Sequence, residues 1–595
     1  MQATSLVSSK FVAIPQVDNS AAARCSEQER RTERRLLRYS GDRLMRTSVL
    51  NRQFLRRLAL MGICMLGSCP ACLAGDNADS AWSSFRNGGT STAEGTYPQA
   101  WSASSGIAWQ KELEGYGQSS PVVFGQHVFV STVIGPQKDE CCLTCYDIAT
   151  GDAAWSFRHA ASTTAPSNYS ASRAAPTPLV DAAAVYAFFE GGDVFAVGHD
   201  GKMIWHRSLT SDYGKFENNH GLGSSPAQTD DMVVINVEHR GPSYLLALNK
   251  KSGDTVWKTE RPSGSSWTSP IVANTPKGMQ VIVSSGGAVT AYDPANGSEV
   301  WTLGGLAGNS VPSPVYADSR LYVGARVPEF GSTQEAAQSN LCLQLNPPEG
   351  TEHQVLWRAS KAFCDYASPV VNGDCVYYLN NVGVLYCLNA QTGDVHYTER
   401  LGTTCWATPV VSGDLTYFFG KDGTTQVVRT GSSFEKVSTN LLWDPMNPPK
   451  PETYTEAEGS AYERGAGDGD GSASTSQESP GQPQSAGSTE AGAGRRSGRG
   501  AGMLAAITKG DANGDGIITE QELPAEFREM LPRIDLNGDK SLDAAELKAM
   551  EESFRRRREG SRDSARDPIV YGVAAVNGTF LVRTGTRLYC IRETK

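Results

Sequence analysis

The chain has 595 residues, of which 39% are hydrophobic, and its formal net charge is −10. This length exceeds what one ordinary hydrophobic core holds, so the sequence indicates either several domains or one closed ring of many small sheets. Residues 1–74 carry an excess of seven positive charges, which leaves −17 for the rest of the chain. Because an acidic body is repelled by phosphate backbones, the charge argues against nucleic acid as a partner.

The first 74 residues are interpreted as a targeting region. Three arginines precede an apolar run over residues 58–66, and small residues follow up to Ala74. This order is typical of a signal peptide, which we place at about 45–74, with Met45 as the start of translation. The apolar run is too short for a permanent membrane span. We therefore expect an exported protein of the bacterial periplasm or cell envelope.

The same region also resembles a lipoprotein signal. Residues 66–69, with the sequence Leu-Gly-Ser-Cys, are similar to a bacterial lipobox, in which Cys69 would be acylated and become the mature N-terminus. The sequence favours ordinary cleavage after Ala74, with a lipid anchor at Cys69 as the alternative.

Internal repetition is the strongest feature of the sequence. A phrase of Ser or Thr, then Pro, then apolar residues recurs every 40–57 residues, a spacing typical of a four-stranded propeller blade. The prolines of this phrase are Pro121, Pro178, Pro226, Pro270, Pro314, Pro369 and Pro409. A second phrase has an Asp or Asn, a Gly four residues on, and a Trp four residues further. Its full copies are Asp147, Gly151 and Trp155; Asn249, Gly253 and Trp257; and Asp293, Gly297 and Trp301.

Residues 367–398 show how one repeat is expected to fold. Four short strands alternate with glycine-containing turns, and such a sheet buries both faces only by stacking on copies of itself. Residues 574–591 match three of these four strands. The missing outer strand is predicted at residues 106–113, so that both ends of the chain complete one blade and close the ring. The predicted fold is all-β, an eight-bladed β-propeller over residues 75–443 and 569–595.

The phrase from Asp147 to Trp155 is similar to the tryptophan-docking motif of the quinoprotein (PQQ) repeat family. That family includes quinoprotein alcohol dehydrogenases and the propeller lipoprotein of the outer-membrane β-barrel assembly machinery. The resemblance covers roughly residues 80–440 and 569–595 and implies the propeller fold, but a fold alone does not fix an activity. No motif matches the Glu, Asn and Asp calcium ligands of a quinoprotein dehydrogenase. PQQ is therefore not expected as a cofactor.

The repeat also explains several cysteines. Cys145, Cys387 and Cys590 occupy one position of the repeat, which alanine holds in other blades. A small buried side chain is expected there, because free cysteine behaves as a small hydrophobe. The adjacent Cys141 and Cys142 resemble the vicinal disulfide beside the cofactor of quinoprotein alcohol dehydrogenases, but the surrounding sequence departs from that motif. We interpret the pair as a coincidence.

The composition changes abruptly after residue 443. Residues 444–502 are rich in Pro, Gly, Ser and Glu, which predicts a disordered linker. Residues 503–556 contain two calcium-loop patterns of the EF-hand type and predict a small α-helical insert, which a charged linker at 557–568 follows. In the first loop the predicted ligands are Asp511, Asn513, Asp515, Ile517 through its carbonyl, Thr519 through a water, and Glu522. In the second loop they are Asp535, Asn537, Asp539, Ser541, Asp543 and Glu546.

The two loops differ at their sixth position. Gly516 allows the sharp turn of the first loop, whereas the second loop has Lys540 there. A left-handed backbone costs a non-glycine residue about 1–2 kcal/mol, so weaker calcium binding is expected in the second loop. Ile518 and Leu542, at the eighth position of each loop, are predicted to meet in a short β bridge. The close spacing of the loops resembles dockerin-type modules.

Residues that enter the central channel are expected three positions before each Pro phrase. Four of the eight blades place an aromatic ring there. With the polar residues nearby, the channel candidates are Gln118, Arg173, His220, Trp267, Asn309, Tyr366, Trp406 and Tyr571. An aromatic mouth of this kind suits a sugar, a peptide or a quinone. The sequence favours the alternative, in which these rings pack between neighbouring blades.

The sequence contains no evident nucleophile–base pair, histidine-rich metal spacing or phosphate-binding glycine loop. It therefore favours an exported, non-catalytic scaffold for protein or ligand interaction, with calcium bound by the insert. The alternative is a PQQ-dependent oxidoreductase, similar to quinoprotein alcohol or sugar dehydrogenases, that uses the propeller channel.

Overall fold

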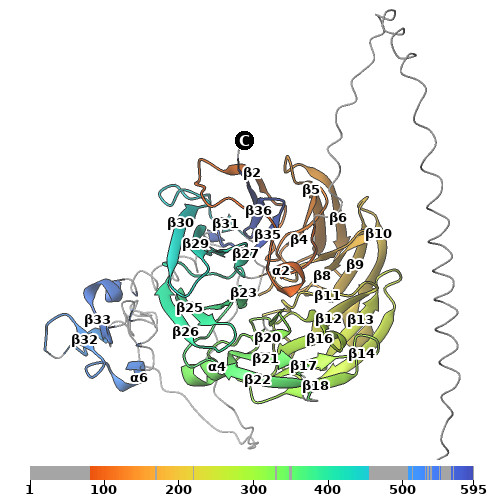
Figure 1. The fold of residues 1–595 in the computed structure, drawn as a ribbon. Coiled ribbons are helices and arrows are strands. Elements are labelled where there is room, and N and C mark those ends of the chain that lie inside the picture. Colours follow the sequence, from red (N-terminus) through yellow and green to blue (C-terminus); the bar gives the residue numbers. More distant parts are fainter. Residues whose placement is uncertain are drawn as a thin grey trace, which may run out of the picture. The chain divides into compact units, whose positions relative to one another are not determined.

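The computed structural model in Figure 1 carries the ring of β-sheets that the repeats predict. The residues that it describes are 81–453 except 168–170, 219, 329–330 and 348–350; parts of 507–550; 565–566; and 568–593. The predicted signal peptide, Cys69 and most of the predicted linkers lie outside these residues. None of the described helices is long and apolar enough to cross a membrane.

Eight antiparallel sheets form the blades, which Figure 1 shows as a ring coloured from orange through green to blue. The strands of blades one and two are β1 (Ala81–Trp82), β3 (Val122–Phe124), β4 (His127–Ile134), β5 (Glu140–Asp147), β6 (Ala153–Ala160), β7 (Leu179–Val180), β8 (Ala184–Phe188), β9 (Asp193–Gly198) and β10 (Met203–Ser208). Those of blades three and four are β11 (Ala227–Gln228), β12 (Met232–Val237), β13 (Ser243–Asn249), β14 (Thr255–Arg261), β15 (Ile271–Thr275), β16 (Gly278–Ser285), β17 (Ala288–Tyr292) and β18 (Glu299–Leu303).

The remaining blades repeat the same order of strands. Blades five and six consist of β19 (Val315–Ala317), β20 (Arg320–Val323), β21 (Leu341–Leu345), β22 (His353–Arg358), β23 (Val370–Asn372), β24 (Cys375–Leu379), β25 (Val384–Asn389) and β26 (Val395–Arg400). Blades seven and eight consist of β27 (Val410–Ser412), β28 (Leu415–Phe419), β29 (Thr424–Arg429), β30 (Glu435–Leu441), β35 (Gly572–Val576), β36 (Thr579–Arg583), β37 (Arg587–Ile591) and β2 (Ile107–Glu112). Short helices lie between strands as α3 (Leu209–Tyr213) and α4 (Thr333–Ser339). The segment labelled α2 (Arg86–Gly89) is a tight turn, because Asn87 and Gly88 have non-helical backbone angles.

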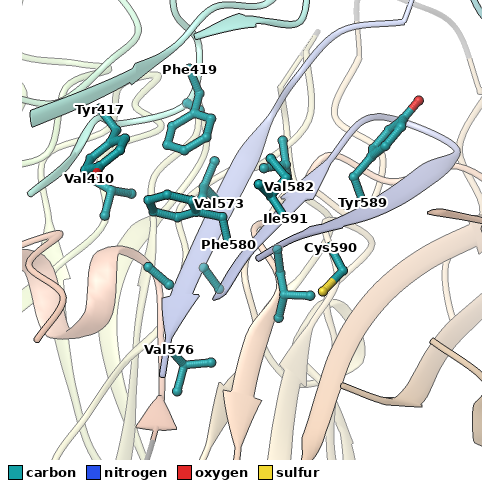
Figure 2. Close-up of a cluster of buried hydrophobic side chains, with 14 of the residues drawn as sticks. Val410, Tyr417, Phe419, Val573, Val576, Phe580, Val582, Tyr589, Cys590 and Ile591 are labelled. Atoms are coloured by element: carbon teal, nitrogen blue, oxygen red, sulfur yellow. The ribbon is translucent and has the colours of Figure 1, made fainter. Parts of the chain in front are cut away.

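Blade eight closes the ring as predicted. The N-terminal strand β2 pairs antiparallel with the C-terminal strand β37, and Trp109 lies opposite Cys590. Blade eight thus takes its outer strand from the N-terminal part of the propeller and its other three strands from the C-terminal part. The hydrogen bonds between β2 and β37 therefore hold the ring closed. Figure 2 shows the core beside this junction, where Phe580 of blade eight lies 4.8 Å from Tyr417 and 5.3 Å from Phe419 of blade seven, measured between ring centres.

The recurring tryptophans join consecutive blades. Trp155 donates its indole N–H to the carbonyl of His199 in the next blade at 2.8 Å. Its ring also lies against Gly201, where a Cβ would stand only 2.9 Å away. Six blades place an alanine or cysteine directly opposite a tryptophan, for example Cys145 opposite Trp155 and Cys590 opposite Trp109. In blade six Cys387 lies opposite Tyr397 instead. The cysteines at this position are therefore buried packing residues, as the repeat predicts.

The N-terminal segment 81–97 crosses the inner edge of the ring, and we call it the strap. The repeats did not predict it. Its strand β1 pairs with β3 of blade one, and the carbonyl of Ser83 accepts the backbone N–H of Val180 in blade two at 2.9 Å. Farther along, Ala93 donates to the carbonyl of Val411 in blade seven at 2.8 Å. The strap thus occupies the side of the ring where each innermost strand turns into the second strand, which we call the hairpin side.

The insert between blades seven and eight begins later than its composition suggests. Strand β31 (Glu452–Thr453) pairs with β34 (Ala565–Arg566), so the two ends of the insert lie side by side. Glu452 is only 2% exposed, and its carboxylate accepts the backbone N–H groups of Gly585 and Thr586, both at 3.0 Å. The Glu452 carboxylate thus provides hydrogen-bond acceptors for the backbone N–H groups of the β36–β37 turn. Residues 444–453 therefore belong with the propeller and not with the linker.

Candidate functional site

Four of the eight predicted channel residues lie in or beside a continuous row of aromatic rings. Tyr366 and Trp406 are 5.0 Å apart between ring centres, and Trp406 and Tyr571 are 5.6 Å apart. The hydroxyls of Tyr571 and Tyr116 are 3.1 Å apart. We call the side chains of Tyr366, Trp406, Tyr571 and Tyr116 the aromatic arc. It spans blades six, seven, eight and one on the side of the ring where the innermost strands begin, which we call the mouth side.

An arginine stands at each end of the aromatic arc. The guanidinium of Arg173 lies 3.6 Å from the centre of the Tyr116 ring, and that of Arg326 lies 6.0 Å from the Tyr366 ring. Both distances are within the range of cation–π attraction. Burial, followed by the neighbouring Tyr571, raises the pKa of Tyr116 well above its usual value. The arc therefore consists of three phenols and an indole between two guanidinium groups.

The loop that carries Arg173 is fixed by a buried ion pair. Lys138 and Glu190 are 3.1 Å apart, and both are almost fully buried. Lys138 also donates to the carbonyl of Ser172 at 2.6 Å, and Glu190 accepts the backbone N–H of Ala174 at 2.9 Å. Breaking such a pair leaves a buried charge without compensation, which is costly. The pair thus holds Arg173 against the arc.

The other predicted channel residues have separate roles. Gln118 accepts the backbone N–H of Arg173 at 3.0 Å and so supports that loop. The rings of His220 and Trp267 are 6.1 Å apart, and the Trp267 indole donates to the carbonyl of Gly221 at 3.0 Å. Asn309 is buried; its amide donates to the carbonyl of Ala288 at 2.8 Å and to the hydroxyl of Ser284. Asn309 therefore fixes a loop of blade four.

Two members of the site, Tyr116 and Arg326, were missed by sequence reasoning. Tyr116 lies five residues before Pro121 and Arg326 lies outside the repeat phrases, so neither occupies the position from which the channel residues were predicted. The contact of Tyr116 with Tyr571 joins residues 455 positions apart. Tyr116 lies in the loop before the innermost strand β3, and Arg326 lies in the loop between β20 and β21, the second and third strands of blade five. A search for aromatics and cations in both kinds of loop would have found both.

Cys141 and Cys142 lie next to each other on β5, and both are buried free thiols. Successive side chains of a strand point to opposite faces of the sheet. The Cys142 sulfur accordingly lies 3.3 Å from the hydroxyl of Ser156 on the neighbouring strand. This geometry separates the two sulfurs on the third strand of blade one.

The two predicted calcium loops have matching backbone geometry. Their eighth residues, Ile518 and Leu542, pair in the two-stranded ladder β32 (Ile518–Thr519) and β33 (Ser541–Leu542), as predicted. The sixth residue is left-handed in both loops, with φ of 79° at Gly516 and 67° at Lys540. Of the predicted ligands of the second loop, Asn537 lies outside the described residues, whereas Asp535 is described.

Hydrogen bonds inside the loops also correspond. The sixth N–H donates to the first carboxylate in each loop, from Gly516 to Asp511 at 3.1 Å and from Lys540 to Asp535 at 2.9 Å. The ninth N–H donates to the twelfth carboxylate, from Thr519 to Glu522 at 3.1 Å and from Asp543 to Glu546 at 3.0 Å. Among the described residues, no three His, Cys, Asp or Glu side chains are clustered so as to hold a metal ion. Helix α6 (Ala525–Arg528) lies between the loops in sequence.

Comparison with known proteins identifies the family. The family model described as "Outer membrane protein assembly factor BamB" matches residues 90–219, 215–350 and 344–465. The chain belongs to this family. No curated protein matches the chain.

Solved structures with similar folds have low identity. BamB from Moraxella catarrhalis is 15% identical, with a TM-score of 0.40, over 56% of this chain and 87% of that chain. A europium-containing methanol dehydrogenase is 11% identical, with a TM-score of 0.35, over 60% and 90% of the two chains. Quinohemoprotein alcohol dehydrogenase from Comamonas testosteroni is 13% identical, with a TM-score of 0.35, over 64% and 83%.

Proposed function

We propose that this member of the BamB family is an exported, non-catalytic scaffold that binds a protein partner at the aromatic arc. The observation that carries the proposal is the row of rings from Tyr366 to Tyr116, with an arginine at each end. Tyrosine, tryptophan and arginine are the residues most enriched at the centres of protein interfaces. The family description, an outer membrane protein assembly factor, supports a partner in the cell envelope.

The accessible part of the arc lies at its blade-six end. Tyr366 is 40% exposed, and the neighbouring Trp406 and Arg326 are half-buried. The other end, at Tyr116 and Arg173, is buried. A partner would therefore contact Tyr366 first, while the buried rings keep the exposed ones in a fixed orientation. Such preorganisation lowers the entropic cost of binding.

Site-specific photocrosslinking tests this proposal. A photoreactive phenylalanine analogue at position 366 should form a discrete adduct in cells that express the full chain. The matched control is position 356, because Leu356 is 38% exposed but lies on the outer strand β22. The adduct at 366 should fall at least tenfold when Trp406→Ala or Arg326→Ala is added. Equal crosslinking at both positions, or an adduct unaffected by these substitutions, would contradict the proposal.

The alternative function, a PQQ-dependent oxidoreductase, requires room for the quinone in the channel. The strap is hydrogen-bonded to the innermost strands on the hairpin side, and Trp82 is fully buried there. The preference for a scaffold rests on the sequence, in which no motif matches the calcium ligands of a quinoprotein dehydrogenase. Incubation of residues 75–595 with PQQ and calcium should produce no stoichiometric quinone absorption band. Such a band, together with dye-linked oxidation of an alcohol or sugar, would favour the enzyme.

We also propose that the insert binds calcium. The matching hydrogen bonds of the two loops and the pairing of Ile518 with Leu542 support an EF-hand pair. Oxygen donors at positions 1, 3, 5, 7, 9 and 12 suit a hard cation. In the first loop these would be Asp511, Asn513, Asp515, the Ile517 carbonyl, Thr519 and Glu522. Export, by a cleaved signal peptide or as a lipoprotein anchored at Cys69, is part of the same proposal.

A further inference from the structure

A buried arginine of the strap has no acidic partner among the described residues. Arg86 is only 3% exposed, and it makes one described hydrogen bond, from Nη2 to the carbonyl of Pro314 in blade five at 2.8 Å. Its Nε and Nη1 atoms are buried and have no hydrogen-bond partner in the described part of the chain. Burial lowers the pKa of Arg86 to about 9. A guanidinium in such surroundings gains strongly from an anion.

The backbone that presents Arg86 is itself strained. Arg86 and Asn87 have φ values of 54° and 46°, in the left-handed region that non-glycine residues rarely adopt. Each such residue costs about 1–3 kcal/mol and persists where the surrounding structure holds it in place. Here the following Gly89 is packed so closely that a Cβ would stand 2.9 Å from the Ile271 side chain. The turn at 86–89 therefore fixes Arg86 on the inner side of the ring.

A cavity of about 550 Å³ lies on the hairpin side, between the strap and blades one to four. Arg86 lines it, together with Lys250, Gln228, Asp181 and Asp230. Lys250 is 6% exposed; its ammonium donates to Asp181 at 2.9 Å and to Gln228 at 2.8 Å. An ammonium carries three donors, and these two hydrogen bonds use two of them. The volume is in the range of sites that bind small molecules.

We propose that this cavity binds a small monocarboxylate that also carries hydroxyl or ammonium groups. Arg86 and Lys250 would attract the carboxylate of the ligand. The hydroxyl or ammonium groups of the ligand would donate to the carboxylates of Asp181 and Asp230, which line the same cavity. Those two carboxylates disfavour a dianionic phosphate, because like charges in a partly buried site repel strongly. Sugar acids and the carboxyl ends of short peptides share the required chemistry. The site is distinct from the aromatic arc, which lies on the mouth side.

Calorimetric titration of residues 75–595 tests the site with defined probes. The probes are D-glucuronate for the sugar acids and alanylalanine for the peptide carboxylates, with D-glucose and inorganic phosphate as comparisons. At least one carboxylate should bind in roughly the millimolar range or tighter, and at least tenfold more tightly than glucose or phosphate. Whichever carboxylate binds identifies the source of the ligand. If neither binds, or if glucose or phosphate binds equally well, the proposal is wrong.

Two variants establish where the probe binds. Arg86→Gln removes the guanidinium and should weaken binding at least tenfold in a chain that remains folded by circular dichroism. Asn274→Trp places a bulky ring at the exposed rim of the cavity while Arg86 is kept, and should also weaken binding at least tenfold. The matched control is Gln391→Trp, at an exposed turn of blade six outside the cavity, which should bind normally. Undiminished binding by Asn274→Trp would overturn the proposal, even if Arg86→Gln does not fold.

Discussion

The indole of Trp109 lies against Gly151, where a Cβ would stand 2.7 Å from the ring. This contact joins the outer strand of blade eight to the turn after β5 in blade one, and the indole N–H adds a hydrogen bond to the carbonyl of Ile148 at 3.1 Å. The circle therefore closes through the same tryptophan–glycine contact that joins other neighbouring blades.

Gly151→Ala tests the closing contact. Gly151 has φ of 73°, so alanine would cost about 1–2 kcal/mol through the left-handed backbone alone. Forcing a methyl group into the indole should add about 1–3 kcal/mol. The matched control is Gly402→Ala, because Gly402 has φ of 76° and nothing within 4 Å of its Cβ position. Thermal unfolding should show a clearly larger loss for Gly151→Ala, and equal losses would mean that the indole contact is unimportant.

Glu452→Gln tests how the base of the insert is attached to blade eight. Its buried carboxylate accepts two backbone N–H groups of the β36–β37 turn and the hydroxyl of Thr584. Hydrogen bonds to a charged group are worth about 1.5–3 kcal/mol each, so the propeller should melt earlier by several degrees. Glu435→Gln is the control, since Glu435 is 59% exposed in its ion pair with Arg429 and exposed pairs contribute little. A similar effect of both substitutions would refute the attachment.

Thiol reactivity tests whether the cysteines opposite the tryptophans are buried as closely as the structure shows. Burial chiefly raises the pKa values of Cys145, Cys342 and Cys590 to about 12, from the usual value of 9. These thiols contribute stability that is present below pH 9 and is lost as the pH rises toward 12. At pH 8 only about one thiol in 10⁴ is ionised, so alkylation by iodoacetamide should be negligible in the folded protein.

Cys375 provides the internal comparison for this alkylation. A hydrogen bond from Cys387 is the main cause that lowers the pKa of Cys375 below its usual value. Both cysteines also contact the carbonyl of Gly431, at 3.4 Å and 3.9 Å. Peptide mass spectrometry should find Cys375 modified before Cys145, while guanidinium chloride should make all sites react. Early labelling of Cys145 would mean that its environment is more open than the structure shows.

The repeated elements were predictable from the sequence, and the irregular ones were not. The ring closure at Trp109 could be predicted because residues 574–591 match the repeat except for its outer strand. Equivalent positions of the repeat pack in the same way in each blade, so a pattern seen in one blade applies to the others. The strap has no repeat phrase, and its position depends on hydrogen bonds such as that between Val180 and Ser83, which join different blades. Arg86 and Tyr116 likewise gain their roles from residues far away in the sequence, which local patterns do not encode.

Calcium titration tests the insert and the strain at its sixth loop position. The φ of 67° at Lys540 is the left-handed conformation that the loop pattern demands, and Gly516 meets the same demand without cost. Lys540→Gly should therefore strengthen the weaker site by about 1–2 kcal/mol, or roughly 5- to 30-fold in affinity. Glu522→Gln removes a charged ligand from the first loop and should chiefly abolish the tighter site.

Calorimetry on residues 75–595 should show two sites in the range of about 10⁻⁷–10⁻³ M. The control is Asp254→Asn, an exposed carboxylate in a blade-three turn, which should leave both affinities unchanged. If Lys540→Gly alters neither site, backbone strain does not limit binding in the second loop.

The pairing of Thr453 with Ala565 brings the two ends of the insert together, so replacing residues 454–564 by Asn-Gly should preserve the propeller while removing both calcium sites. Calcium binding that survives this replacement would place the sites in the ring.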